Sequence, residues 1–364
     1  MESTSPALRR LIDRIEAARD DKLLLDIRGG GTKSFYGNAP SGDELDVRDL
    51  TGITSYEPTE LVVTVLAGTP LAKLESVLAD RGQCLSFEPP HFGETGTVGG
   101  MVAAGLSGPA RASVGPLRNF VLGVTMLNGR GELLTFGGQV IKNVAGYDLS
   151  RLMAGSMGIL GVICEVSLKV MPILPACRTL SLDIDEAAAQ RQLNRWGGEP
   201  FPLSASAWYQ DRLYVRLAGG EAAVDLSQRR VGGQDLEPQT AEKWWSDIRD
   251  HHHEFFTLGA GEFERGDCLW RLSVPDTVPP IPLPGRQFIE WGGAQRWLRS
   301  TAPAADIRSA AARVGGHATL VRAADKSPGV FAELSHASMN IHRRLKQSFD
   351  PAGIFNPGRL YREL

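Results

Sequence analysis

Three consecutive glycines follow an apolar run near the start of the chain. The run covers residues 23–27 and predicts a β-strand, and the turn after it reads Arg28-Gly29-Gly30-Gly31-Thr32-Lys33-Ser34. Because glycine has no Cβ, the backbone N–H groups of such a turn can converge on an anion at short range. A second glycine-rich segment follows at residues 96–105. Two such segments in one α/β chain indicate a long phosphate-bearing cofactor that is held at two places.

The spacing of the glycines excludes two common nucleotide-binding motifs. A Walker A loop requires Gly-Lys followed by Ser or Thr, and the chain contains no Gly-Lys pair. A G-x-G-x-x-G fingerprint opens a helix, whereas residues 28–34 have a different glycine spacing and residues 35–40 break any helix. The remaining interpretation is a flavin dinucleotide that is bound without a Rossmann fold.

The four cysteines give no sign of a metal centre. They are Cys84, Cys164, Cys177 and Cys268, and no two of them have C-x-x-C spacing. Cys84 and Cys164 lie in apolar, strand-like runs, which favours a role as small buried side chains. We therefore expect no metal site in this chain, and we expect any electrons that it accepts to leave to another protein.

Composition and charge narrow the class of partner. The chain has 364 residues, enough for two or three domains, and a formal net charge of −3 from 39 basic and 42 acidic residues. This balance lacks the excess of positive charge that is typical of proteins that bind nucleic acid or an anionic membrane. No apolar stretch is long enough for a membrane span, and residues 1–20 predict an amphipathic helix rather than a signal peptide. We expect a cytoplasmic protein.

The first half of the chain alternates strands, helices and glycine turns. Residues 61–67 predict a strand, 70–81 a helix and 84–87 a second strand, which together make a β-α-β pattern. Asn128-Gly129-Arg130-Gly131 predicts a hairpin turn between strands at 120–127 and 132–136. Residues 1–175 are therefore expected to form one α/β domain.

The pattern changes after residue 175. The glycine-rich turns stop, and two similar sets of strands and helices follow, at residues 179–231 and 268–322. They predict a second domain, residues 176–325, with an antiparallel sheet and helices. The last segment, 326–364, contains a long amphipathic helix at 329–349 and a turn-rich end.

Five stretches of the chain are informative together, in a fixed order: residues 27–32, 96–100, 142–149, 155–163 and 349–358. In combination they resemble the vanillyl-alcohol oxidase / p-cresol methylhydroxylase family of FAD-linked oxidoreductases. Within that family the chain most resembles the smaller FAD-binding subunits of bacterial glycolate oxidases, which work beside a larger flavin subunit and an iron–sulfur subunit.

The resemblance implies a fold, a cofactor and a function. The implied fold is α+β: a PCMH-type two-lobed FAD-binding domain, a cap domain with an antiparallel sheet, and a C-terminal helix that returns to the FAD domain. The implied cofactor is FAD. Family members with covalent flavin often carry His in the first loop, where this chain has Gly31-Thr32, so we expect non-covalent FAD. The implied reaction is oxidation of a small 2-hydroxy acid, glycolate, with electrons passed to a partner in a heteromeric complex that can associate with the membrane through its other subunits.

The resemblance also implies roles for individual residues. The first glycine turn would wrap the pyrophosphate, the second segment would lie against the ribityl chain and isoalloxazine, and Arg359 or Lys142 would place a positive charge near the pyrimidine edge. The implied cofactor-binding residues are Arg28, Gly29, Gly30, Gly31, Thr32, Lys33, Ser34, Pro90, Thr97, Val98, Gly99, Gly100, Ala103, Gly105, Lys142, Gly158, Gly161, Ile163, Asn356 and Arg359.

The chain departs from the histidine pattern of catalytic members of the family. Oxidation of a 2-hydroxy acid needs a cation for the carboxylate and a base or metal for the hydroxyl proton. The catalytic relatives usually carry a histidine-rich cluster, whose nearest counterpart here is residues 315–322, with one histidine. The candidate catalytic residues are His91, His317 and Arg322. Side chains five residues apart on a strand point to opposite faces, so His317 and Arg322 would need a bend in order to share a site.

Three hypotheses stay open at this stage. In the first, the chain is a flavin-carrying accessory subunit that relays electrons or stabilises a complex. In the second, it is a stand-alone FAD-dependent D-2-hydroxy-acid dehydrogenase with an unusual site. In the third, it is a flavin-free scaffold that has kept the fold. The missing histidine cluster favours the first.

Overall fold

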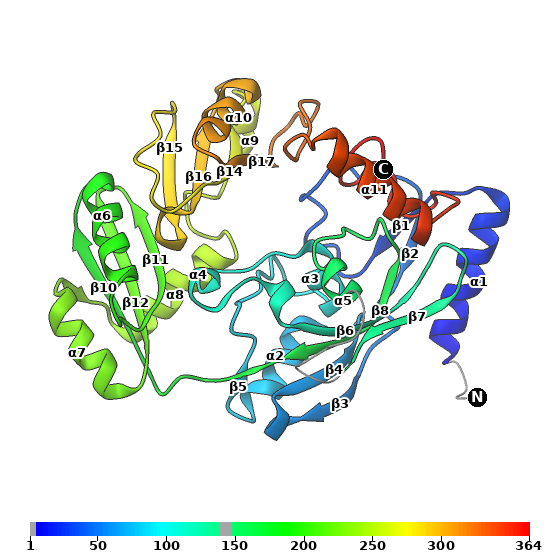
Figure 1. Cartoon of the computed structure of the whole chain (residues 1–364), viewed down its shortest axis with the longest axis horizontal. Coiled ribbons are helices and arrows are strands. Elements are labelled where there is room, and N and C mark those ends of the chain that lie inside the picture. Colours follow the sequence, from blue (N-terminus) through cyan, green and yellow to red (C-terminus); the bar gives the residue numbers. More distant parts are fainter. Residues whose placement is uncertain (1–4, 139–147) are drawn as a thin grey trace. The chain divides into compact units, whose positions relative to one another are not determined.

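A computed structural model describes residues 5–138 and 148–364, which form two compact units (Figure 1). Unit 1 contains Met1–Leu106, Pro116–Pro172 and Glu333–Leu364, and unit 2 contains Ser107–Gly115 and Ile173–Ala332. None of the helices within the described residues is long and apolar enough to cross a membrane.

The core of unit 1 is a five-stranded sheet in which all neighbouring strands are antiparallel. Its strands, in spatial order, are β3 (Ile53–Glu57), β4 (Val62–Leu66), β8 (Val162–Lys169), β6 (Val121–Leu127) and β7 (Leu133–Gly137). The central strands are nearly continuous apolar runs, because helices α2 (Leu71–Ala79) and α3 (Val98–Ala104) pack with them in one hydrophobic core. The predicted hairpin is confirmed as β6–β7.

A smaller lobe of unit 1 is built from the N-terminal segment. Helix α1 (Pro6–Asp21) begins after Ser5, whose hydroxyl accepts the N–H of Leu8 at 3.2 Å. Strand β1 (Leu25–Arg28) pairs in parallel with β2 (Asp43–Asp46). The apolar residues of this lobe form a separate core that includes Leu11, Ile15, Leu25, Leu45 and Phe355.

The C-terminal segment returns to this lobe, as predicted. Helix α11 (His336–Phe349) begins seven residues later than the predicted start at 329, because Ser335 caps it by accepting the N–H of Ser338 at 3.2 Å. Beyond the helix, the backbone of Leu25 donates to Ile354 at 2.8 Å and accepts from Asn356 at 2.9 Å. The chain end is thereby joined to β1, at the base of the first glycine turn.

Unit 2 is organised around one eight-stranded sheet. Its order is β13 (Gln234–Asp235), β10 (Ala176–Asp183), β12 (Arg212–Gly219), β11 (Leu203–Tyr209), β15 (Arg286–Glu290), β16 (Gln295–Ser300), β14 (Cys268–Ser273) and β17 (His317–Arg322). Its helices are α6 (Glu186–Gly197), α7 (Glu221–Val231), α8 (Pro238–Arg249) and α10 (Ala304–Arg313). The two similar sets of elements seen in the sequence are the two halves of this sheet, joined where Ala207 of β11 pairs with Glu290 of β15.

The segment Ser107–Gly115 groups with unit 2, although the sequence-based division places it in a domain of residues 1–175. The indole N–H of Trp291 donates to the carbonyl of Gly108 at 3.1 Å, and the Arg111 guanidinium lies 4.4 Å from the centre of the Trp291 ring. These contacts join residues almost two hundred positions apart, so no local pattern signals them.

Short elements complete the fold. They are η1 (Pro58–Glu60), β5 (Gln83–Cys84), α4 (Arg111–Val114), η2 (Leu117–Asn119), α5 (Leu149–Leu152), β9 (Met171–Pro172), α9 (Ala260–Glu264) and η3 (Trp291–Gly293).

Candidate functional site

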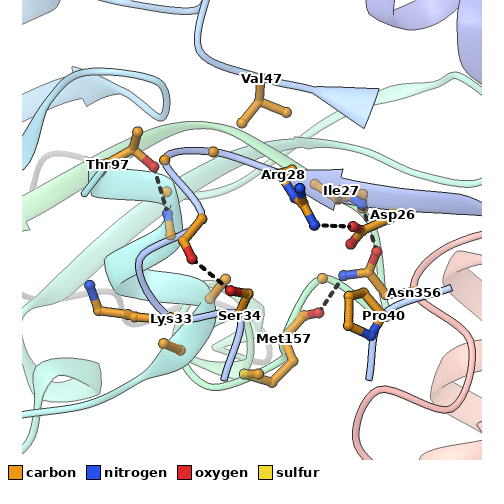
Figure 2. Close-up of a pocket in the computed structure, with 18 of the residues that line it drawn as sticks. Asp26, Ile27, Arg28, Lys33, Ser34, Pro40, Val47, Thr97, Met157 and Asn356 are labelled. Carbon is orange, nitrogen blue, oxygen red and sulfur yellow. Dashed lines mark hydrogen bonds and ion pairs between the residues drawn. The ribbon is translucent and has the colours of Figure 1, made fainter. Parts of the chain in front are cut away.

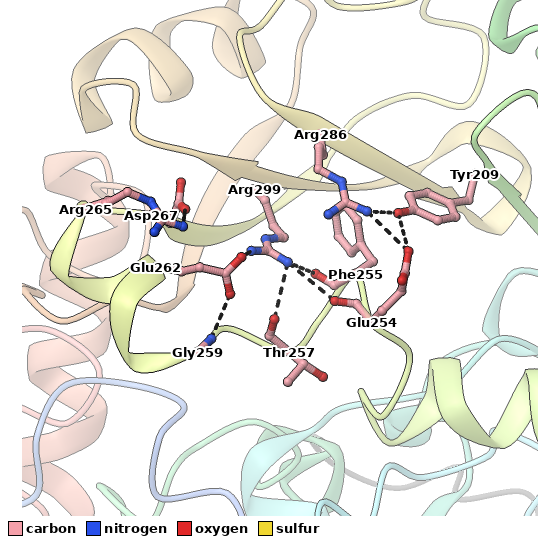
Figure 3. A network of polar contacts seen from close by, with 10 residues as sticks. All are labelled: Tyr209, Glu254, Phe255, Thr257, Gly259, Glu262, Arg265, Asp267, Arg286 and Arg299. Atoms are coloured by element: carbon pink, nitrogen blue, oxygen red, sulfur yellow. Dashed lines mark hydrogen bonds and ion pairs between the residues drawn. The ribbon is translucent and has the colours of Figure 1, made fainter.

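A cavity opens in unit 1 around the first glycine turn (Figure 2). Residues from four distant parts of the chain line it. They are Asp26, Ile27, Arg28, Gly29, Gly30, Gly31, Thr32, Lys33, Ser34, Pro40, Val47, Thr97, Gly99, Gly100, Ala103, Ala104, Met157, Gly158, Gly161, Ile163, Asn356 and Arg359.

The first glycine turn presents unused hydrogen-bond donors to this cavity. Within the described residues, none of the backbone N–H groups of Gly29, Gly30, Gly31 and Thr32 donates to another part of the chain. The four residues are partly or fully exposed, so water or a ligand can reach these N–H groups. Four consecutive donors at one cavity therefore make a site for an anion with several oxygens.

The individual glycines of the turn are required for different reasons. Gly31 has φ +70°, in the left-handed region that glycine enters at no steric cost. A Cβ on Gly30 would overlap the carbonyl oxygen of Thr95, and one on Gly29 would overlap the hydroxyl of Thr97. Close packing of the segment at 95–97 on the turn is thus possible only without side chains.

The second glycine segment is a helix start rather than an open loop. Thr97 caps α3 by accepting the N–H of Gly100 at 3.2 Å. The N–H groups of Val98 and Gly99 donate to the carbonyls of Thr69 and Ala67 at 3.0 and 2.7 Å. The N–H groups of Val98, Gly99 and Gly100 are therefore already bonded within the chain. The segment contributes small side chains to the cavity wall.

The charged groups of the cavity are mainly positive. Arg28, Lys33 and Arg359 line it together with one carboxylate, Asp26, whose Oδ2 accepts from Arg28 at 3.1 Å. Burial raises the pKa of Asp26, against the opposing effect of Arg28 and Arg359. Burial likewise lowers the pKa of Arg359. This charge balance suits a pyrophosphate better than a neutral ligand.

Most of the residues that the sequence predicted for the cofactor line this one cavity. Pro90, Val98 and Gly105 do not: Val98 is fully buried in the core, and Gly105 is the left-handed residue that ends α3 at φ +65°. Lys142 lies outside the described residues. The sequence analysis missed Asp26, Ile27, Pro40, Val47, Ala104 and Met157. Of these, Asp26 and Ile27 could have been predicted from the sequence, because they directly precede the turn.

Of the candidate catalytic residues, His91 lies in unit 1 beside the turn but does not line the cavity. Its Nε2 lies 2.8 Å from the Glu75 carboxylate of α2. Its carbonyl accepts from the Lys33 ammonium at 3.4 Å. The imidazole therefore lies against a carboxylate, a combination of groups that serves acid–base chemistry in other proteins.

His317 and Arg322 lie on edge strand β17 of unit 2. The expectation that they face opposite sides is wrong, because the ladder between β14 and β17 is irregular between Leu269 and Trp270. His317 pairs with Ser273 and Arg322 with Leu269, four residues apart on β14, so both side chains project from the same face. Partial burial and the positive charge of Arg271 lower the pKa of His317.

Fold and cavity together define the class of protein as an FAD-linked oxidase. Residues 8–137 match the family "FAD binding domain", and residues 324–360 match "FAD linked oxidases, C-terminal domain". The chain is 45% identical over 354 residues to glycolate oxidase subunit GlcE of Escherichia coli, a match that covers 97% of each chain. It belongs to the family of that glycolate oxidase subunit.

More distant relatives agree with this assignment. A D-lactate dehydrogenase of Archaeoglobus fulgidus is 34% identical over 161 residues, which is 43% of this chain and 35% of the relative. Among solved structures, alkyldihydroxyacetonephosphate synthase superposes with a TM-score of 0.67 over 96% of this chain and 74% of its own, at 15% identity. That likeness confirms the predicted two-lobed fold, and FAD is the cofactor of this class.

Proposed function

We propose that this chain is the FAD-binding subunit of a complex that oxidises glycolate to glyoxylate, and that its FAD lies in the cavity of unit 1. The observation that carries the proposal is the set of four unengaged N–H groups at residues 29–32, beside three cationic side chains. Neither a nucleic acid nor a neutral metabolite explains that combination. A dinucleotide with a pyrophosphate explains it directly.

Different residues of the cavity bind different parts of FAD. The amides of residues 29–32 bind the pyrophosphate, and Lys33, whose side chain lies over the Phe92 ring, adds positive charge. The wall formed by Thr97, Gly100 and Ala103 accommodates the ribityl chain and the ring system. Bound FAD supplies the acceptor for the electron pair that leaves the substrate carbon. The absence of a histidine in the first turn supports non-covalent attachment.

Substrate handling and partners form the second part of the proposal. His91, beside Glu75, and the pair His317 and Arg322 are the groups proposed to bind the 2-hydroxy acid or move its proton. Residues 176–325 act as the cap or partner domain, and 326–364 complete the FAD domain. The partners are a larger flavin subunit and an iron–sulfur subunit, in a cytoplasmic complex that associates with the membrane through them.

Two measurements test the proposal. The purified chain is expected to be yellow, with one FAD per chain, and acid precipitation should leave the flavin in the supernatant. A colourless protein that takes up no added FAD would overturn it. Adding glycolate without partners then separates the remaining hypotheses: bleaching of the flavin spectrum by the chain alone identifies a stand-alone dehydrogenase, whereas bleaching only in the complex identifies a subunit.

A further inference from the structure

We infer that Asn356 and Arg359, in the C-terminal tail, are positioning residues that hold the first glycine turn in its anion-binding shape, so that tail docking and FAD binding are one linked equilibrium. The inference rests on the proposed function only for the identity of the ligand. The geometry that carries it is a network of contacts that joins the tail to residues 27–38, more than 300 positions away in the sequence, and to Met157.

Asn356 holds the strand that leads into the turn. Its Oδ1 accepts the N–H of Ile27 at 2.7 Å, and its Nδ2 donates to the carbonyl of Met157 at 2.7 Å (Figure 2). The residue is 6% exposed and has φ +40°, a left-handed conformation that asparagine tolerates better than most residues. One amide side chain therefore joins the last residues before the turn to the segment at 157–158, on the far wall of the cavity.

Arg359 holds the chain that leaves the turn. Its guanidinium donates to the carbonyls of Ser34 at 2.9 Å and Lys33 at 3.5 Å, and also to the carbonyl of Asn38. These three acceptors belong to one short stretch of backbone, and the group is only 6% exposed. Most of the five N–H donors of the guanidinium are thus committed to the turn rather than to a ligand.

Asn38, in the loop that follows the turn, donates hydrogen bonds to the tail. Its backbone N–H donates to the carbonyl of Arg359 at 3.1 Å, and its Nδ2 donates to the carbonyl of Gly358 at 2.8 Å. The loop and the tail therefore bind each other through groups on both partners. Since the shape of residues 33–38 depends on the tail, the adjoining amides of residues 29–32 are held toward the cavity only while the tail is docked.

A direct electrostatic role is the competing explanation for Arg359. If its charge acts on the FAD pyrophosphate, Arg359→Lys should bind FAD almost as well as the native chain, and Arg359→Met should bind it with a weaker dependence on salt. If Arg359 acts through the loop, a lysine cannot hold three carbonyls with the geometry of the planar fork. Both variants should then lose affinity to a similar extent, with the salt dependence unchanged.

The test uses the full-length apo-protein. The affinity for FAD is measured by quenching of flavin fluorescence at two salt concentrations, and hydrogen exchange of the amides at 33–38 is measured without FAD. We expect Arg359→Lys and Arg359→Met each to weaken FAD binding about tenfold or more and to speed exchange at 33–38. Native-like affinity of the lysine variant, or unchanged exchange in both, overturns the inference.

Two further variants separate positioning from general stability. Leu78→Ala removes a buried side chain of α2 from the main core of unit 1, away from both the tail and the turn, so it should lower the melting temperature but leave FAD affinity and exchange at 33–38 unchanged. An equal loss of affinity in Leu78→Ala overturns the inference. If the Arg359 variants do not fold, Asn38→Ala tests the same contacts from the loop, with the same expected changes. The exchange measurement remains decisive even if the ligand is not FAD.

Discussion

A buried lysine on the tail helix provides the sharpest test of how unit 1 is held together. The Lys346 ammonium donates to the carbonyls of Ile159 and Phe355 at 2.8 and 2.7 Å, and to the Asp350 carboxylate at 2.7 Å. Asp350 is 1% exposed and also accepts the N–H of Phe355 at 2.8 Å. Lys346 thus joins the tail to Ile159, which directly follows the cavity-lining residues Met157 and Gly158.

Replacing this lysine with methionine should destabilise unit 1 strongly. Lys346→Met keeps much of the apolar volume but leaves the Asp350 carboxylate buried without its counter-ion. Removal of one partner from a buried pair costs about 3–5 kcal/mol. For a unit of this size, that corresponds to a fall in melting temperature of roughly 6–20 °C. The double variant Lys346→Met/Asp350→Asn should recover part of the loss, because no uncompensated charge remains and the amide oxygen can still accept N–H groups.

The assay can follow the two units separately. All seven tryptophans lie between residues 196 and 297, within unit 2, so tryptophan fluorescence reports that unit, whereas release of FAD reports unit 1. Lys346→Met should lower the temperature of flavin release much more than the tryptophan transition. A variant that melts within about 2 °C of the native chain, or a double variant that is less stable than the single one, would refute the account of a buried ion pair.

Three further predictions concern the turn and two buried titratable groups. Gly30→Ala should weaken FAD binding more than Gly31→Ala, because a Cβ at residue 30 overlaps the Thr95 carbonyl. A Cβ at residue 31 has free space, so Gly31→Ala costs only the roughly 1–2 kcal/mol of a left-handed alanine. Equal affinities of the two variants in FAD titrations would contradict this. Burial raises the pKa of Asp26, so its ionisation opposes folding as pH rises through the folded-state pKa. Asp26→Asn should therefore melt higher than the native apo-protein at pH 7, with the difference shrinking toward pH 4, and a variant less stable at pH 7 would show that the ion pairs dominate. Burial, reinforced by Arg322 and Arg271, holds the pKa of His251 well below its usual value, so stability of unit 2 should fall as pH drops below about 6.5, where the unfolded chain takes up the proton. His251→Phe, which can keep the stacking on Phe256, should reduce this slope in tryptophan-monitored melts, and an unchanged slope would assign it to other groups.

The observed helices and strands agree closely with the predicted ones where apolar residues recur at a clear helical or strand spacing. The strand predicted at 61–67 is β4, Val62–Leu66, and the helix predicted at 70–81 is α2, Leu71–Ala79. Elements were missed where the local signal was weak. Strand β2 reads Asp-Glu-Leu-Asp, and its one apolar side chain, Leu45, cannot define a period; it exists because β1 offers it a parallel partner.

Helix α3 forms against the helix propensity of its own residues. Its two glycines disfavour a helix by propensity. The helix forms because Thr97 caps it and because Gly99 packs so closely on Ala67 that a Cβ would clash there. Tertiary packing thus decided the conformation, and the N–H groups of Val98 and Gly99 donate to the backbone of Thr69 and Ala67.

The amino-acid sequence by itself determined the class of cofactor, because closely spaced glycines, a basic residue at each end of the turn and a C-terminal Asn-Pro-Gly-Arg are chemical signals that can be read in one dimension. Only the tertiary structure decided how the turn acquires its shape. The groups that hold it are mostly backbone carbonyls at residues 33–38, which every sequence contains, and their partner is an arginine more than 300 residues away. Hydrogen bonds to main-chain acceptors leave no side-chain pattern, so folding alone brings the two ends of the site together.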